Sequence, residues 1–497
     1  MKRSVNAPGK LSWAKKAYAV FVLSATTAVA LPAQTFTTLF SFDSANGGYP
    51  RASLVQGTDG SLYGTTSIGG ASYLGTIFKI TQSGTLTKLY NFCSQTGCTD
   101  GASPFAGLVQ ATNGNLYGTT GGYGTGILYG GTVFKITPSG TLTTLHNFCA
   151  ESGCTDGANP YAGLTQGTDG NLYGATYFGG TSNNGVVFKI TPSGTLTTLY
   201  NFCVQSSCTD GKNPSAGLIQ ATNGDLYGTT WGGGAANGGT VFKITPTGTL
   251  TTLYNFCSQS GCADGEYPSS GLVQATNGEL YGSTSYGGSG GLYGTVFKIT
   301  PTGTLATLHS FLCAPSGACT DGYGPTAALI QATDGSLYGT TSRGGARYAG
   351  TVFRITPRGT LTTVYDFCSQ IPCTDGYGPQ GGLVQATNGE FYGTAFSGGA
   401  GGECTNGCGT VFSLSVGLSP FVKPQPASGK VGAVVRILGT DLTGTTSLTF
   451  NGMAAVFKVE SASLILATVP TGATTGTIQV VTPSGTLSSN VAFRVVP

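Results

Sequence analysis

The chain repeats itself seven times between Gln34 and Val416, with a period of about 54 residues. The best-kept landmark is a Leu-Tyr-Gly triplet, which begins at Leu62 and returns for the seventh time as Phe391-Tyr392-Gly393. A fixed period of this size is typical of propellers and solenoids, because each unit buries its apolar face only against a neighbouring unit. The repeat therefore limits the possible folds more than any other feature of the chain.

One unit predicts four antiparallel strands. In the second unit, residues 107–112 form a short apolar strand, Asn113-Gly114 is a strong hairpin signal, and residues 115–120 pair back. Residues 131–137 and 141–148 predict the third and fourth strands, the latter from its period-two alternation. Seven such units predict an all-β fold, a seven-bladed β-propeller with four-stranded blades. A β-solenoid is the alternative, although its coils are shorter and usually lack a hairpin turn.

The two ends of the repeat region are complementary. Residues 35–42 match the fourth strand of the other units, yet they precede every complete unit. The last unit stops after its third strand, residues 409–416. We therefore expect the N-terminal strand to complete the last blade and to remove an open sheet edge. The propeller is assigned to residues 34–416.

The first 33 residues predict a signal peptide. Basic residues up to Lys16 precede an apolar run over 17–31, and small residues offer cleavage after Ala30 or Ala33. The apolar run is too short to span a bilayer comfortably. Only 8% of the chain is charged and its net charge is +3, which disfavours nucleic acid as a partner. We expect an exported protein, periplasmic, surface-bound or secreted, with no transmembrane segment after cleavage.

The fourteen cysteines fit that compartment, because an even number in an exported chain predicts disulfides. Six pairs recur at one place in the repeat, and a seventh lies elsewhere in the last unit. The pairs are Cys93 with Cys98, Cys149 with Cys154, Cys203 with Cys208, Cys257 with Cys262, Cys313 with Cys319, Cys368 with Cys373, and Cys404 with Cys408. Zinc is the alternative, but each ion needs about four thiolate or histidine ligands, and the chain has 2 histidines. We expect neither a metal nor a cofactor.

The repeated motifs resemble a known family. Leu-Tyr-Gly-Thr-Thr, Gly-Thr-Val-Phe-Lys-Ile-Thr and Ser-Gly-Thr-Leu-Thr-Thr-Leu-Tyr-Asn-Phe are similar to the Gloeobacter/Verrucomicrobia-type ("GloVer") tandem repeat. The resemblance covers about residues 35–416, since the motifs recur in order in each unit. It implies an exported, surface-associated bacterial protein and implies no activity.

The tail has a different character. After Pro420 the period stops, and short strand-like segments follow at 432–441, 448–452, 467–470 and 476–483. Residues 417–497 resemble an IPT/TIG domain, an immunoglobulin-like β-sandwich. The segment has no cysteine, so we expect core packing alone to hold it together.

Few residues offer catalytic chemistry. His146 and His309 occupy a repeat position that holds tyrosine or phenylalanine in other units, which indicates packing. The aspartates of the repeated Thr-Asp-Gly segments favour a structural turn over calcium binding or acid catalysis. They are Asp100, Asp156, Asp210, Asp264, Asp321 and Asp375, with Asp264 preceded by alanine. Glu151, Glu266 and Glu403 follow no pattern. We expect no enzyme; a propeller lyase or hydrolase is an alternative that requires converging carboxylates.

A glutamine recurs on the first strand of every unit. The seven are Gln56, Gln110, Gln166, Gln220, Gln274, Gln331 and Gln385. If this strand is innermost, the amides either join neighbouring blades by hydrogen bonds or face the channel as ligand-binding groups. The first interpretation is favoured, because buried amides need partners.

The best candidates for recognition are the two variable positions that follow Leu-Tyr-Gly-Thr-Thr. They carry Tyr177, Phe178, Trp231, Tyr286, Arg343 and Phe396. Aromatic rings stack on sugar rings, and the same residue types anchor protein interfaces. We expect a surface binding or scaffold protein for neutral polysaccharide. The alternatives are an envelope protein with a structural or protein-partner role and no glycan affinity, and simple drift in a tolerant loop.

Overall fold

The computed structural model describes residues 34–122, 130–150, 152–314, 317–401, 404 and 406–496. The signal peptide predicted over residues 1–33 lies outside these residues. The described chain is almost entirely β, with three short 3-10 helices: η1 (Thr96–Cys98), η2 (Ser206–Cys208) and η3 (Ser260–Cys262). None of the helices in this part of the chain has the length and apolar character needed to cross a membrane.

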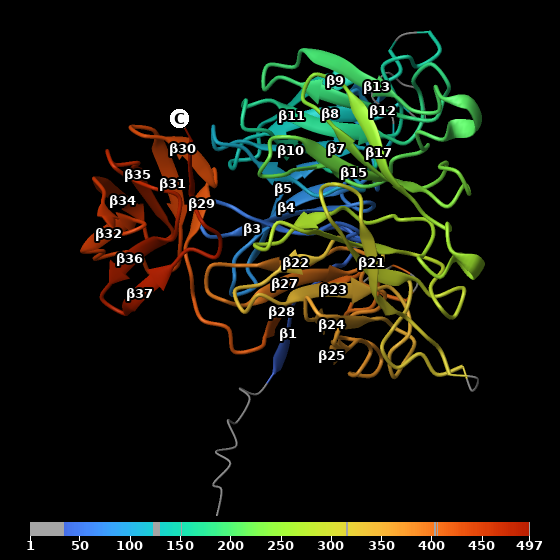
Figure 1. The fold of residues 1–497 in the computed structure, drawn as a ribbon. Helices are drawn as coiled ribbons and strands as arrows, with labels where there is room; N and C mark the ends of the chain where they lie inside the picture. Colours follow the sequence, from blue (N-terminus) through green and yellow to red (C-terminus); the bar gives the residue numbers. More distant parts are fainter. Residues whose placement is uncertain are drawn as a thin grey trace, which may run out of the picture.

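The repeat region forms seven four-stranded antiparallel sheets, arranged like the blades of a propeller (Figure 1). We number them as blades 1 to 7 in chain order. Blade 1 contains β2 (Val55–Gln56), β3 (Leu62–Thr66), β4 (Thr76–Ile80) and β5 (Leu86–Asn91). Blade 2 contains β6 (Val109–Gln110), β7 (Leu116–Thr120), β8 (Thr132–Ile136) and β9 (Leu142–Asn147). Blade 3 contains β10 (Thr165–Gln166), β11 (Leu172–Thr176), β12 (Val186–Ile190) and β13 (Leu196–Asn201). Blade 4 contains β14 (Ile219–Gln220), β15 (Leu226–Thr230), β16 (Thr240–Ile244) and β17 (Leu250–Asn255). Blade 5 contains β18 (Val273–Gln274), β19 (Leu280–Thr284), β20 (Thr295–Ile299) and β21 (Leu305–Ser310). Blade 6 contains β22 (Ile330–Gln331), β23 (Leu337–Thr341), β24 (Thr351–Ile355) and β25 (Leu361–Asp366).

Blade 7 is built from both ends of the repeat region. It contains β26 (Val384–Gln385), β27 (Phe391–Ala395), β28 (Thr410–Ser415) and, as its outer strand, β1 (Thr35–Ser41). β1 pairs with β28 from Thr35↔Ser415 to Ser41↔Thr410. The pairing covers the edge that β28 would otherwise expose, so the N-terminal segment is a structural part of the last blade.

The Leu-Tyr-Gly triplet recurs because its glycine lies in a tightly packed place. A Cβ on Gly64 would lie 2.5 Å from the Phe78 ring and 2.6 Å from a methyl group of Leu54. The flanking Leu62 and Tyr63 are fully buried. Every residue of β3 is buried, which a central strand covered on both faces requires. The triplet is therefore a packing motif of the second strand.

Seven apolar clusters fill the spaces between neighbouring blades. One of them joins Tyr117 and Phe148 of blade 2 to Leu172 and Phe188 of blade 3. Another joins Phe42 and residues of blade 1 to Val411 and other residues of blade 7. Each blade thus buries its two faces against its two neighbours. Such sharing explains why a single unit has no core of its own.

The repeated glutamines form a circle of hydrogen bonds between blades. The backbone N–H of Thr58 donates to Oε1 of Gln110 in the next blade, at 2.9 Å. The same bond recurs seven times at 2.8–3.1 Å, and the seventh joins Thr387 of blade 7 to Gln56 of blade 1. This confirms the interpretation of the glutamines as inter-blade hydrogen-bonding groups. We call it the glutamine circle.

The same amides also hold their own hairpins. Nε2 of Gln110 donates to the carbonyl of Gly114 in its own Asn-Gly turn, at 3.0 Å. Five other glutamines make the equivalent bond, and Gln56 instead donates to Oγ1 of Thr387. The first strand was predicted over 107–112 but has only two ladder residues, because Thr112 donates to the neighbouring blade.

The backbones of neighbouring blades approach each other closely three residues before the repeated glutamine. A Cβ on Gly107 would lie 2.7 Å from the carbonyl oxygen of Ser53 in the preceding blade, and one on Gly382 would lie 2.8 Å from that of Ala328. Gly382 also donates its N–H to Oγ of Ser53 at 2.9 Å, which joins blade 7 to blade 1. The residues that precede each first strand therefore lie at the contact between neighbouring blades.

Residues after the repeat form two four-stranded sheets around a separate core. One sheet has the order β29 (Lys423–Gln425), β31 (Val434–Leu438), β35 (Leu464–Thr468) and β34 (Phe457–Ser461). The other has the order β33 (Met453–Ala454), β32 (Ser447–Phe450), β36 (Ile478–Thr482) and β37 (Gly485–Ser488), and β30 (Ser428–Lys430) pairs with β38 (Arg494–Val496). Buried side chains of both sheets, such as Ile437 and Phe450, pack together. We call this unit the C-terminal sandwich.

The C-terminal sandwich lies against the face of the blades that carries the hairpin turns (Figure 1). Oγ of Ser463 donates to the carbonyl of Thr58 in blade 1 at 2.9 Å, and Nε2 of Gln425 donates to the carbonyl of Gln110 at 2.6 Å. Arg494 reaches the carbonyl of Thr222 in blade 4. The turn face is therefore partly covered, whereas the long loops project from the opposite side.

Replacing Gln385 tests the glutamine circle. Gln385→Ala leaves the N–H of Thr333 and the carbonyl of Gly389 without this amide. Since a lost partner costs a buried polar group about 1–3 kcal/mol, we expect that decrease in the unfolding free energy measured in urea. Gln205→Ala removes an exposed glutamine that bonds only locally to Thr209, and we expect a change below about 0.5 kcal/mol. Equal effects of the two substitutions would contradict the proposed importance of the circle.

Replacing Phe36 tests the closing strand. The Phe36 ring stacks on Tyr365 of blade 6 at 3.9 Å and on Phe412 of blade 7 at 5.1 Å. Because the ring is half-buried, we expect Phe36→Ala to lower the unfolding free energy by about 2 kcal/mol, below the roughly 3–5 kcal/mol typical of buried phenylalanines. Thr37→Ala, at an exposed position of the same strand, is the control. A negligible effect of Phe36→Ala would mean that β1 adds little to blade 7.

Candidate binding site on the loop face

The face opposite the hairpin turns is built from two kinds of loop. One kind joins the second and third strands of a blade, and the other joins one blade to the next. Isolated bridges hold the two together, as between Ala102 and Gly122 or Ala158 and Phe178. We call this side the loop face. It carries the variable residues, on a frame that the strands and bridges keep rigid.

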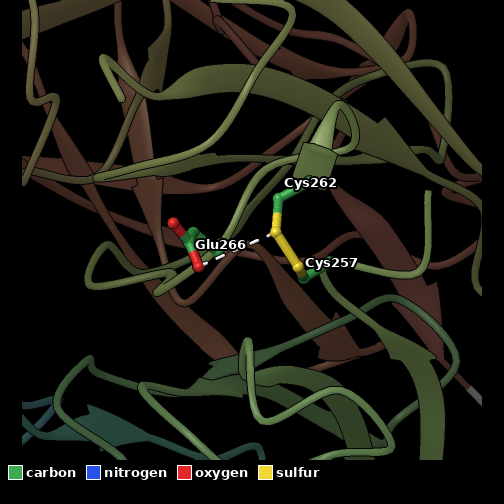
Figure 2. A group of neighbouring side chains, drawn as sticks. All are labelled: Cys257, Cys262 and Glu266. Atoms are coloured by element: carbon green, nitrogen blue, oxygen red, sulfur yellow. Dashed lines mark hydrogen bonds between the residues drawn. A yellow bond between two sulfur atoms is a disulfide. The ribbon is translucent and has the colours of Figure 1, made fainter. Parts of the chain in front are cut away.

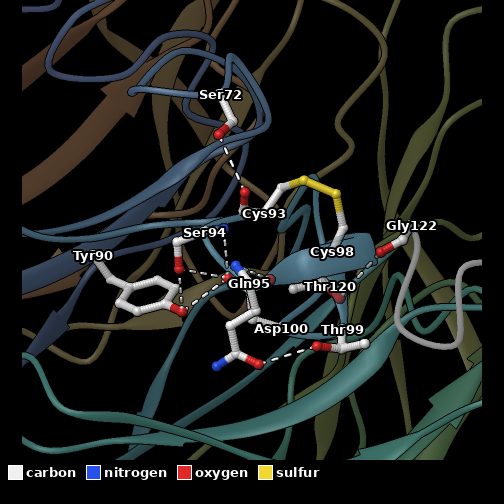
Figure 3. The surroundings of a disulfide bond; sticks show 10 residues. All are labelled: Ser72, Tyr90, Cys93, Ser94, Gln95, Cys98, Thr99, Asp100, Thr120 and Gly122. Atoms are coloured by element: carbon white, nitrogen blue, oxygen red, sulfur yellow. Dashed lines mark hydrogen bonds between the residues drawn. A yellow bond between two sulfur atoms is a disulfide. The ribbon is translucent and has the colours of Figure 1, made fainter.

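A disulfide and a buried aspartate stiffen the connection after blade 1 (Figure 3). Oδ2 of Asp100 accepts hydrogen bonds from Tyr90 Oη at 2.8 Å and from the Ser94 N–H at 2.9 Å. Oδ1 accepts the N–H of Gln95 at 3.3 Å. The Cys93–Cys98 disulfide closes the same loop. Both carboxylate oxygens thus hold the turn, as the sequence predicted for a structural aspartate.

All seven predicted cysteine pairs are joined by disulfides. Six of them close the connections that follow blades 1 to 6, and the seventh closes a loop within blade 7. The bonds join Cys93 to Cys98, Cys149 to Cys154, Cys203 to Cys208, Cys257 to Cys262, Cys313 to Cys319, Cys368 to Cys373, and Cys404 to Cys408. The sequence separation of the partners is 5 in five of the pairs and 4 in Cys404–Cys408, whereas it is 6 in the connection after blade 5. The pairing predicted from the sequence, including that of Cys154, Cys319 and Cys373, therefore agrees with the structure.

The aspartate contact is also repeated, with a change of partner in two connections. Where histidine replaces tyrosine, Nε2 contacts the same aspartate, His146 with Asp156 at 2.9 Å and His309 with Asp321 at 2.8 Å. The N–H of Cys149 donates to the other oxygen of Asp156 at 3.1 Å. The histidines therefore take the hydrogen-bonding role of the tyrosine, which agrees with a structural position.

The connection before blade 1 departs from the pattern in a compensated way. It lacks the cysteine pair, and Phe40 stands where the other units have tyrosine or histidine. The neighbouring loop of blade 7 supplies Cys404–Cys408 instead. The carbonyl of Cys408 accepts the N–H of Tyr49 at 2.8 Å, so this disulfide braces the segment that enters blade 1.

Figure 2 shows the one group of neighbouring cysteine and acidic side chains that resembles a metal site in the described residues. It contains Cys257, Cys262 and Glu266. The two sulfurs are bonded to each other, so neither is available as a thiolate ligand. Burial raises the pKa of Glu266, which also disfavours a charged ligand there. This donor set does not suit a metal ion.

The loop face carries a continuous line of aromatic side chains and one arginine across blades 7, 1, 2 and 3. Tyr49 stacks on Phe396 at 4.6 Å, and the Arg51 guanidinium lies 4.7 Å from the Phe396 ring and 5.3 Å from the Phe105 ring. The line continues through Phe105–Tyr161 at 5.2 Å, Tyr161–Tyr177 at 5.5 Å and Tyr177–Phe178 at 4.7 Å. We call this set the aromatic arc; its members are Tyr49, Arg51, Phe105, Tyr161, Tyr177, Phe178 and Phe396.

Blade 2 has glycine where the neighbouring blades have an aromatic residue, yet the arc is unbroken there. A Cβ on Gly121 would lie 2.5 Å from the Phe105 ring. Gly121 thus makes room for Phe105, which enters from the preceding connection and fills the place. The aromatic surface is kept although the residue that supplies it changes.

One part of the arc lies close to the backbone contacts between neighbouring blades. Arg51, Phe105 and Tyr161 each stand two residues before the circle of close backbone contacts described for Ser53 and Gly107. Phe178, at one end of the arc, is 39% exposed. Burial, and then the neighbouring Tyr161, raise the pKa of Tyr177, so its hydroxyl remains a donor at neutral pH.

The remaining predicted residues lie in other blades. Trp231 stacks on Tyr267 at 4.6 Å, and Tyr267 meets Tyr286 at 6.0 Å. Trp231 and Tyr286 are 37% and 49% exposed, so this second group also offers aromatic surface. Arg343 is exposed in blade 6, where its backbone pairs with that of Tyr323. Within the described residues, ring contacts do not link Arg343 to either group.

The sequence predicted three of the seven residues of the aromatic arc. It singled out Tyr177, Phe178 and Phe396 but missed Tyr49 and the residues that follow a recurring proline. Those residues are Arg51, Phe105 and Tyr161, after Pro50, Pro104 and Pro160. The proline recurs in every connection, and the residue after it varies from arginine and aromatics to serine, threonine and glutamine. The signal was the same as the one used after Leu-Tyr-Gly-Thr-Thr, variation on a fixed frame.

A hollow lies between the C-terminal sandwich and the turn face. It has a volume of ≈ 760 Å³, and Gln110, Gln166 and Gln220 of the glutamine circle line one side of it. Gln425 and Arg494 line the other side. Oε1 of Gln425 is buried without a hydrogen-bond partner. The lining amides already bond to backbone groups, so the hollow is less suited to recognition than the loop face.

The loop connections predict a defined dependence of stability on pH. Burial, followed by the hydrogen bond to Asp100, raises the pKa of Tyr90 from 10.0 to about 12. The stabilising contribution of Tyr90 is therefore complete below pH 10 and is lost as pH rises toward 12. We expect the stability difference between the protein and Tyr90→Phe to shrink between about pH 8 and pH 11.5 in urea unfolding. Tyr73→Phe, which removes the hydroxyl of a side chain that is 64% exposed, is the control.

Comparisons with known proteins support the repeat and give no activity. The solved structure of the extracellular domain assigned to a one-component system, BT4673, of Bacteroides thetaiotaomicron has a TM-score of 0.48 and 12% identity, covering 92% of this chain. The chain spans only 48% of that domain's length. A structure assigned as a 6-phosphogluconolactonase from Bacteroides uniformis has a TM-score of 0.42 and 16% identity. The match covers 63% of this chain and 84% of the Bacteroides uniformis chain. No curated protein matches the sequence.

A family model supplies the assignment. The model of the Gloeobacter/Verrucomicrobia repeat matches residues 25–155, 130–331 and 316–430, which together cover most of the chain. The matches agree with the extent of the repeated motifs and of the seven blades. The chain belongs to the Gloeobacter/Verrucomicrobia repeat family.

Proposed function

We propose that the protein is an exported glycan-binding protein and that the aromatic arc is its recognition surface. The single observation that carries the proposal is the unbroken line of ring contacts from Phe396 to Phe178, across four neighbouring blades. Aromatic faces stack well on the apolar faces of sugar rings and at little conformational cost. An extended line of rings suits a chain-like ligand better than a compact one.

We also propose a more detailed fold for the repeat region and for the C-terminal sandwich. The seven blades form a closed seven-bladed propeller over residues 34–416, and residues 417–497 form an immunoglobulin-like module of the IPT/TIG type. The glutamine circle and the seven inter-blade clusters support closure, since both include a link between blades 7 and 1. The C-terminal sandwich supports the second assignment through its two sheets and common core.

Export is proposed from the first 33 residues and from the disulfides. A basic segment followed by an apolar run and small residues is the pattern of a signal peptide. Seven local disulfides suit an oxidising compartment and are rare in a reducing cytoplasm. The periplasm, the outer surface and the medium all satisfy these conditions.

We propose binding without catalysis. Acid catalysis needs a carboxylate that is free to exchange a proton. Asp100 and four of its equivalents hold their loops with both oxygens, and the fifth equivalent, Asp321, contacts His309. Glu266 lies beside a disulfide, and Glu151 and Glu403 lie outside the described residues. A propeller lyase or hydrolase would be favoured instead if incubation with a bound glycan released shorter products.

A role in binding an envelope protein is the main competing function, because tyrosine, tryptophan and arginine are also common at protein interfaces. Only 8% of the residues in the chain are charged, which favours a mostly neutral partner in either case. The two functions differ in one respect. A glycan site should bind isolated oligosaccharides, whereas a protein site should not.

The experiment is a binding screen of polysaccharides and oligosaccharides with the oxidised protein from Gln34 to Pro497. Substitution of an aromatic group that stacks on a sugar ring costs about 1–2 kcal/mol, so Tyr161→Ala should weaken binding about tenfold. Trp231→Ala tests the second aromatic group in the same way. Tyr73→Ala, an exposed tyrosine outside both groups, is the control. Binding that Tyr161→Ala leaves unchanged would exclude the arc, and binding to no glycan would favour the protein-partner role.

A further inference from the structure

Arg51 is the one cation of the aromatic arc, and contacts with neighbouring side chains hold its guanidinium group in place. Its guanidinium lies over the Phe396 ring at 4.7 Å and near the Phe105 ring at 5.3 Å, and Nη1 donates to Oε1 of Gln380 at 3.3 Å. A cation held between aromatic faces is attracted by both rings. The group is therefore positioned by its neighbours although the side chain is exposed.

The charge of Arg51 is not balanced by a carboxylate among the described residues. The ion pairs there join other groups, mainly lysines of the third strands to acids of the hairpin turns, as in Lys79–Asp59 and Lys298–Glu279. Arg51 has only the neutral Gln380 as a hydrogen-bond acceptor among them. The neighbouring residues remove part of the water around the guanidinium, which lowers the pKa of Arg51, and the interaction with Tyr161 partly opposes this effect.

The geometry points to a ligand that carries a negative group on a sugar ring. A guanidinium offers five N–H donors in a planar fork that matches a carboxylate, and most of those of Arg51 remain for a ligand. Phe105 and Tyr161 continue the surface on one side of Arg51, and Phe396 and Tyr49 continue it on the other. A uronic acid residue within a glycan chain provides a stacking face and a carboxylate together.

We propose that the aromatic arc selects acidic glycans and that Arg51 binds the carboxylate of a uronic acid residue. This inference rests on the proposed function and changes the expectation of an entirely neutral ligand. The aromatic rings stack on the uncharged faces of the sugars, and Arg51 binds the one charged group. A sulfate ester on a sugar offers the same negative charge. Its tetrahedral oxygens match the planar fork less well than a carboxylate does.

Pairs of glycans that differ only in charge test the inference. We would measure calorimetric binding of oligogalacturonate, of its methyl-esterified form, and of a sulfated glucan to the oxidised protein from Gln34 to Pro497. We expect the acid form to bind about tenfold more tightly than the ester, since a hydrogen bond to a charged group is worth about that factor. Added salt should reduce the preference only in part, because aromatic rings shield the pair.

Three variants separate charge from shape. Arg51→Gln should bind the acid and the ester equally, and Arg51→Lys should keep part of the preference, because it retains the charge without the planar fork. Arg347→Gln, at an exposed arginine of blade 6, should behave like the unmodified protein.

Each outcome has a distinct meaning. Equal binding of acid and ester by the unmodified protein would overturn the inference and leave the glycan-binding proposal intact. Tighter, Arg51-dependent binding of the sulfated glucan would overturn the assignment to a carboxylate. Binding of none of the three, together with failure of every glycan in the wider screen, would overturn the proposed function itself.

Discussion

The fold depends on one amide per blade, because the glutamine of each first strand joins the local hairpin to the whole ring. Its Oε1 accepts a backbone N–H from the preceding blade, and in six of the seven blades its Nε2 bonds to the turn of its own blade. A turn that slipped by one residue would misplace the amide and lose both bonds. Local register and the assembly of blades are thus coupled through a single side chain. The coupling also explains why glutamine is retained seven times in a chain whose loops vary freely, since a shorter or charged side chain would satisfy only one of the two partners.

This division of labour leaves the loop face available for change. The strands and the glutamine circle hold the turn side. A disulfide and an aspartate hold the loop side in the six connections that follow blades 1 to 6, without help from the variable residues. The exchange of tyrosine for histidine beside Asp156 and Asp321 keeps the same contact with a different ring. The connection before blade 1 lacks a disulfide, and the Cys404–Cys408 disulfide in the neighbouring loop of blade 7 takes its place. A frame that tolerates such substitutions can carry a binding surface at little cost to stability.

Much of the architecture followed from the sequence, because the repeat displays its own frame. The Asn-Gly turns, the four strands, the cysteine pairs and the role of the glutamines were all predictable from spacing and side-chain chemistry. The aromatic arc was predicted only in part, because it depends on contacts between blades. Phe105 and Tyr161 stand in successive units, and nothing in the spacing indicates that their rings meet at 5.2 Å. Arg51 was overlooked for the same reason, since its aromatic neighbours come from blade 7 and from the connection that enters blade 2.

The asymmetry between the two faces gives the clearest physical argument about where recognition takes place. The C-terminal sandwich contacts blades 1, 2, 4 and 7 on the turn face through hydroxyl, amide and guanidinium groups, most of which bond to backbone carbonyls. Such contacts use up the polar groups that a ligand on that face would need. The loop face has the reverse character, with exposed rings and a cation that lacks an anionic partner among the described residues. Stacking and one charged hydrogen bond are complementary forces, because ring contacts supply affinity for many sugars whereas the charge discriminates among them. For the proposed acidic glycan, the placement of Arg51 within a line of rings would therefore contribute to specificity more than to total binding strength.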